Sequence, residues 1–131
     1  MAARAIQSDS LFSIIVGPMV WAAHFLIVYI TTAIACAKNL LHLQVHGYAV
    51  VPLIIVAATA LAAGLIVNGG VLAWRRWRGA GGNLEEMPPH DRPDKDSRRR
   101  FMAYAGLLLC GLSLVATLWV AMPYLFIDSC R

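Results

Sequence analysis

Long runs without a single charged residue dominate the chain. Three such runs lack Asp, Glu, Lys and Arg altogether, and they cover residues 10–37, 39–74 and 101–127. A helix needs about 20 mostly apolar residues to cross a hydrocarbon core of about 30 Å, so each run allows one crossing. The runs are solidly apolar and do not alternate, which excludes the strands of an outer-membrane barrel. We therefore predict an all-α integral membrane protein that forms a single membrane domain over residues 1–131. Its transmembrane helices are expected at about 11–37, 48–75 and 101–127.

Composition agrees with this pattern. Hydrophobic residues make up 60% of the 131 residues and charged residues only 14%. A soluble domain usually holds about 45–50% apolar and about 25% charged residues. The length allows one domain at most, and it is too short for an eight-fold barrel.

The basic residues are distributed unevenly about the three predicted helices. Eight of them lie in the segment 75–100, at Arg75, Arg76, Arg78, Arg92, Lys95, Arg98, Arg99 and Arg100. Arg4 falls on the same side of the membrane, whereas only Lys38 and Arg131 fall on the other. The positive-inside rule then predicts a cytoplasmic N-terminus, a basic cytoplasmic loop at 75–100 and a periplasmic C-terminus. We expect the loop to attract anionic lipid. Nucleic acid is not an expected partner, because the basic residues adjoin the membrane and are mixed with acidic ones.

One ionisable residue falls near the middle of the first predicted helix. His24 lies close to the bilayer midplane, where an ionisable residue is a functional hypothesis by default. The simpler interpretation is a neutral imidazole that is hydrogen-bonded to a neighbouring helix, and Ser113 and Thr117 lie at similar depth. A haem ligand is the sharper alternative, but the other two predicted helices contain no histidine within the membrane.

Small and polar residues recur at helical spacing in all three predicted helices. The stripes comprise Gly17, Trp21, His24, Val28 and Thr31; Ala60, Gly64 and Asn68; and Gly106, Cys110, Ser113 and Thr117. Small residues let helix backbones approach closely, and hydroxyl and amide groups bond across helices. We interpret these residues as helix-packing positions, either inside the bundle or against a larger partner.

The outer face holds two pairs of residues with possible chemistry. His42 and His46 are spaced i, i+4, which is a usable metal-ligand spacing on one helical turn. Cys36 and Cys130 are both expected outside, where an oxidising compartment favours a disulfide between them. A copper site made from the two cysteines and the two histidines is the competing idea. Cys110 is expected to be a small residue of the core.

No enzyme signature is present, since there is no phosphate loop, no CxxC and no set of paired carboxylates within the membrane. We therefore predict no catalytic residue, no cofactor and no metal site. One resemblance involves the first predicted helix, which reads GPMVWAAHF over residues 17–25 and is followed by Tyr29 and Cys36. Together with Pro123 and the later Cys130, this segment resembles small three-helix bacterial membrane proteins that are associated with haem-copper terminal oxidases.

The resemblance implies an accessory or assembly subunit of a cytochrome oxidase in the bacterial inner membrane. Its partners would be larger membrane subunits of the respiratory chain, which themselves hold the copper and haem ligands. Two alternatives stay open. One is a stand-alone assembly factor, similar to a copper chaperone, that uses His42 and His46. The other is a small oligomeric transporter or channel.

Overall fold

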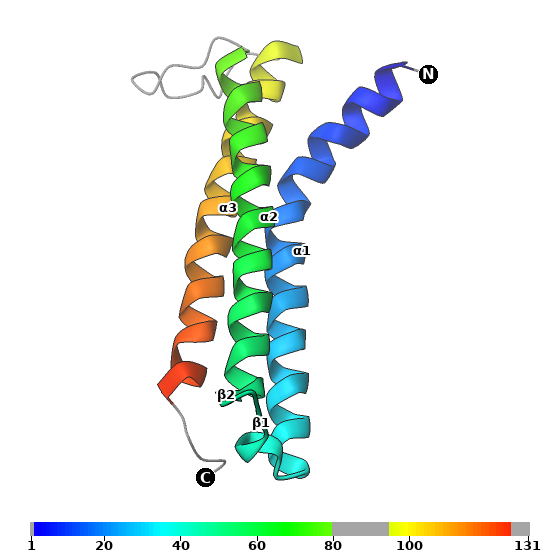
Figure 1. Ribbon diagram of the computed structural model, residues 1–131. Helices are drawn as coiled ribbons and strands as arrows, with labels where there is room; N and C mark the ends of the chain where they lie inside the picture. Colours follow the sequence, from blue (N-terminus) through cyan, green and yellow to red (C-terminus); the bar gives the residue numbers. More distant parts are fainter. Residues whose placement is uncertain (1, 80–94, 127–131) are drawn as a thin grey trace.

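The computed structural model describes residues 2–79 and 95–126, which form three long helices side by side and a short hairpin (Figure 1). The helices are α1 (Ala2–Ala37), α2 (Val50–Gly79) and α3 (Lys95–Phe126). Between α1 and α2 lie a 3-10 turn, η1 (Leu40–His42), and the strands β1 (Gln44–Val45) and β2 (Tyr48–Ala49). The hairpin lies at one end of the bundle, and the start of α1 lies at the other end with the end of α2 and the start of α3 (Figure 1).

Each helix contains a segment that is long and apolar enough to cross a membrane. These segments are Ile14–Ala37, Val50–Gly79 and Ser97–Tyr124, with mean hydropathies of 1.9, 2.7 and 2.1. Only 17–28% of the residues in their most apolar windows are buried inside the protein. Large side chains such as Leu61, Leu112 and Trp119 face outward instead. A water-soluble monomer rarely exposes such continuous apolar surface, so the predicted multi-pass membrane protein with three spanning helices is confirmed.

The helix ends differ from the sequence-based boundaries. α1 begins at Ala2 and continues through Pro18, and Figure 1 shows its N-terminal part leaning away from α2 and α3. Because a proline inside a helix removes one backbone hydrogen bond and crowds the preceding turn, Pro18 accounts for a bend in this region. α3 begins at Lys95, so Arg98, Arg99 and Arg100 lie inside its first turns. α2 extends to Gly79, and the positive charges of the arginines in its last turn interact favourably with the negative end of the helix dipole.

The connection between α1 and α2 is a compact turn. Asn39 adopts a left-handed conformation with φ 56°, which ends α1 as asparagine does at many helix C-termini. His46 and Gly47 follow with φ of 54° and 83°. Two successive residues with positive φ form the two-residue loop that matches the twist of a hairpin, and Val45 pairs with Tyr48 across it.

Two clusters hold the ends of the bundle together. The cluster beside the hairpin comprises Val28, Ala35, Val51 and Ile55, with Leu40 and Tyr124 packed against it. At the opposite end Trp77 is only 4% exposed, and its ring centroid lies 5.2 Å from that of Trp74 and 6.0 Å from that of Tyr104. Trp77 is therefore a core side chain, although it lies near the end of α2.

Candidate functional site

The polar and small residues of α1 and α3 meet in the middle of the bundle. Along α1 Gly17, His24 and Val28 are buried, while Trp21 and Thr31 are half-buried. Along α3 the buried stripe comprises Gly106, Cys110, Ser113 and Thr117. These two predicted stripes therefore lie inside the protein.

Gly17 lets α1 approach the backbone of α3. A Cβ placed on Gly17 would lie 3.2 Å from the Cα of Cys110, 3.2 Å from the Oγ of Ser113 and 3.3 Å from the Sγ of Cys110. Such distances are shorter than ordinary van der Waals contact, so any larger residue must push the helices apart. Close approach through small residues is how transmembrane helices gain packing energy.

His24 is the buried polar side chain at the centre of this region. It is 2% exposed, and its Nε2 lies 3.0 Å from the Oγ1 of Thr59 on α2. The partner thus belongs to α2, whereas the sequence suggested Ser113 or Thr117 of α3. The Thr117 hydroxyl instead donates to the backbone oxygen of Ser113, one turn back on its own helix.

The hydrogen bonds of Thr59 define the direction of the contact. The Thr59 hydroxyl donates to the Ile55 carbonyl oxygen at 2.7 Å. Its single proton is then used, so its oxygen accepts from the imidazole, and His24 is the tautomer with the proton on Nε2. Within the part of the chain that the structure describes, His24 Nδ1 and Trp21 Nε1 are buried and have no hydrogen-bond partner. One turn of α1 therefore presents an unmatched acceptor and an unmatched donor.

The stripe on α2 faces the other way. Ala60, Gly64 and Asn68 are all exposed, and the buried face of α2 lies on the other side of the helix. That buried face comprises Val51, Ile55, Ala62, Ile66, Gly70, Ala73 and Trp77. Among the described residues, no atom lies within 4 Å of the point that a Gly64 Cβ would occupy. Gly64 consequently takes no part in the helix packing of the described residues.

His42 and His46 do not share a helical turn. His42 ends the 3-10 helix η1, whereas His46 sits in the hairpin loop with a positive φ. The expectation that the two histidines lie on one helical turn was therefore wrong. In residues 2–79 and 95–126 no group of three or more His, Cys, Asp or Glu side chains is arranged to hold a metal ion.

The cysteines are placed at different depths. Cys36 is exposed at the end of α1, and Cys110 is a buried free thiol in the middle of α3. Cys130 lies outside the described residues, and so does the segment 80–94 of the predicted basic loop at 75–100. The disulfide between Cys36 and Cys130 therefore stays a prediction.

Sequence reasoning missed Thr59 and the buried face of α2. Thr59 is one hydroxyl among many small residues of the span, and only the packing of α2 against α1 brings it to His24. The face from Val51 to Trp77 does recur at helical spacing, but its aliphatic residues do not differ in polarity from those that face outward.

No protein-family model, curated protein or solved structure matches the chain. The features of the chain that bear on function are the three-helix membrane architecture, the His24 contact and the outward face of α2.

Proposed function

We propose that this protein is an accessory, non-catalytic subunit of a bacterial respiratory membrane complex, with a cytochrome oxidase as the partner. It would stabilise or assemble that complex by helix packing in the inner membrane. The resemblance of the segment around Trp21 and His24 to oxidase-associated proteins supports the choice of partner. The charge distribution supports an orientation with the N-terminus and the arginine-rich loop in the cytoplasm.

The outward face of α2 is the observation that carries the proposal. Gly64 offers open space for a neighbouring helix backbone, and the exposed amide of Asn68 lies one turn further along the same face. A lipid tail cannot hydrogen-bond an amide, whereas a transmembrane helix with a polar side chain can. A helix from a larger subunit is therefore a better neighbour for this face than lipid alone.

The His24 site supports a structural role for this chain. Its imidazole is buried between two helices and bonded to Thr59, an arrangement that joins α1 to α2. This use of a polar side chain fits a subunit whose task is to present a rigid surface.

Affinity purification of the tagged full chain from native membranes in a mild detergent tests the proposal. We expect haem-containing subunits to co-elute in a fixed ratio. A Gly64→Ile variant should lower that ratio at least several-fold, because the added side chain blocks close helix approach. Gly111→Ile is the matched control, since Gly111 is also exposed in the middle of a helix with no described atom within 4 Å of its Cβ position.

Two results would contradict the proposal. One is a chain that elutes without haem subunits from membranes that contain them. The other is stoichiometric copper or haem bound to the chain purified alone, which would instead favour the assembly-factor alternative. An equal loss in both glycine variants would show that the α2 face is not the docking surface.

A further inference from the structure

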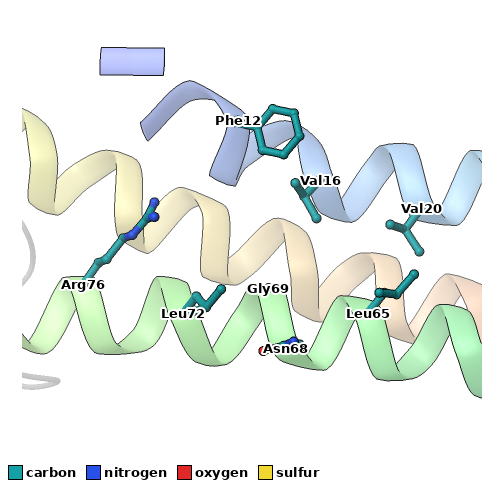
Figure 2. A pocket seen from close by; sticks show the side chains of 8 residues that line it. All are labelled: Phe12, Val16, Val20, Leu65, Asn68, Gly69, Leu72 and Arg76. Carbon is teal, nitrogen blue, oxygen red and sulfur yellow. The ribbon is translucent and has the colours of Figure 1, made fainter. Parts of the chain in front are cut away.

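A groove runs between α1 and α2 on the half of the bundle that carries the arginines. Figure 2 shows Val16 and Val20 of α1 facing Leu65 and Leu72 of α2 across it. Its volume is about 270 Å³. The N-terminal part of α1 leans away from the other two helices (Figure 1), and Phe12 of that part lines the groove. Its remaining lining residues are Asn68, Gly69 and Arg76.

The polar group at the end of the groove is a cation. Arg76 lines the groove and is exposed, and it lies in the last turn of α2. The uncharged run of this helix ends at Trp74, so Arg75 and Arg76 lie where α2 leaves the hydrocarbon core and reaches the lipid headgroups. Arg76 is therefore at the depth where a lipid phosphate is found.

The length of the groove corresponds to one leaflet. From Leu65 to Arg76 a helix rises about 16 Å at 1.5 Å per residue. Half of a hydrocarbon core of about 30 Å is about 15 Å. The apolar walls thus extend from the headgroup level to near the middle of the bilayer, as one acyl chain does.

Gly69 lines the groove between α1 and α2. A Cβ on Gly69 would lie 3.5 Å from the Cγ1 of Val16 on α1 and 3.8 Å from the Sγ of Cys110 on α3, which are ordinary packing distances, so α2 packs against both helices at this glycine. The space is slightly smaller than the roughly 300–1,000 Å³ of pockets that enclose a drug-sized ligand. The groove suits a single acyl chain that lies along the protein surface better than it suits an enclosed ring system.

We propose that this groove binds one acyl chain of an anionic phospholipid whose phosphate is held by Arg76. The positive charge at the headgroup level selects the anionic lipid, and the apolar walls hold its tail. This site is distinct from the general attraction of anionic lipid to the basic segment 75–100, because it requires one particular arginine and one particular groove. It is also independent of any partner subunit.

Native mass spectrometry of the purified full chain tests the site with two probes, dioleoylphosphatidylglycerol and dioleoylphosphatidylcholine. The first should be retained preferentially, with one molecule per chain. Arg76→Gln should lower its retention about fivefold, because one basic residue contributes about 1 kcal/mol to the binding of anionic lipid and 1.4 kcal/mol is tenfold. Arg75→Gln is the matched control, as it removes the same charge from the same turn but does not line the groove.

A second pair of variants tests the tail. Leu72→Trp fills the groove and should reduce retention of both lipids, whereas Val71→Trp adds bulk at the same depth outside the groove and should leave it unchanged. Equal losses for Arg76→Gln and Arg75→Gln would overturn the proposal, since they would show unspecific charge attraction. Normal retention in Leu72→Trp would overturn it too. So would a lipid-free dimer that Leu72→Trp dissociates, because a second copy would then occupy the groove.

Discussion

Removal of the Thr59 hydroxyl is the most direct test of how the bundle is held together. Thr59→Val keeps the shape of the side chain but removes the oxygen that accepts from His24 Nε2. His24 is 2% exposed, so neither water nor lipid headgroups can replace the lost partner. Both ring nitrogens would then be unmatched within the described structure, because Nδ1 has no partner there already.

The expected magnitude follows from two bounds. Hydrogen bonds between transmembrane helices are worth about 0.6 kcal/mol on average and up to about 1.7 kcal/mol. A buried donor without a partner costs about 1–3 kcal/mol. We expect Thr59→Val to lower the free energy of unfolding by about 1–2 kcal/mol. The double variant His24→Leu, Thr59→Val should recover part of this loss, because removal of both partners leaves no unmatched donor.

Equilibrium unfolding in mixed micelles, with a rising fraction of a denaturing detergent and helix content followed by circular dichroism, measures the effect. Thr32→Val is the matched control, since the Thr32 hydroxyl donates to the backbone oxygens of Val28 and Tyr29 on its own helix. This control should change stability by less than about 0.5 kcal/mol, as an ordinary substitution away from buried contacts does. A Thr59→Val effect no larger than that of the control would refute the role of the His24 contact.

Three further predictions concern orientation, oxidation and packing. A reporter fused to the C-terminus should be active outside the cytoplasm and one placed between α2 and α3 inside it, and the reverse result would contradict the orientation drawn from the arginines. Thiol labelling of the unreduced, denatured chain should modify Cys110 alone, with Cys36 and Cys130 reacting only after reduction; three reactive thiols before reduction would exclude the disulfide. Gly17→Leu should destabilise the bundle by about 1–3 kcal/mol through overpacking against α3, whereas Gly111→Leu should be tolerated; equal unfolding midpoints would disprove the close contact at Gly17.

The sequence allowed prediction of the spans more readily than of their contacts. A transmembrane span lacks charged residues because placing a charged group in hydrocarbon is costly, and this cost does not depend on the neighbouring helices. Which face turns inward depends on the neighbours. His24 is distinct enough from its apolar surroundings to indicate the inner face of α1, whereas the inner face of α2 differs little in polarity from its outer face. Gly64 and Asn68 do lie on one face of α2, and this face is exposed on the outside of the bundle.

The connection between α1 and α2 shows a different limit of prediction from sequence. The spacing of His42 and His46 predicts proximity only if the intervening backbone is helical. Gly47 follows His46, and a glycine at this position favours the two-residue hairpin loop with positive φ that the structure contains. The turn residues therefore indicate that the two histidines do not share a helical turn, which their i, i+4 spacing alone does not reveal.

Asn68 belongs to both surfaces proposed for this chain, the partner-binding face of α2 and the lipid groove, and its substitution affects the two in different ways. It belongs to the outward stripe of α2 and also lines the groove, so Asn68→Leu exchanges an amide for an apolar side chain at both places. In the isolated chain this exchange should leave stability unchanged or raise it, because an amide exposed to lipid lacks the hydrogen bonds that water would supply. It should also leave phosphatidylglycerol retention unchanged, since Arg76 and the apolar walls stay intact.

Assembly with the partner should instead weaken about 3- to 20-fold, which corresponds to an interhelical hydrogen bond of about 0.6–1.7 kcal/mol. Detergent unfolding and co-purification measure the two effects side by side. A variant that loses stability by itself would place Asn68 in the internal packing of the bundle and contradict its role at a partner interface.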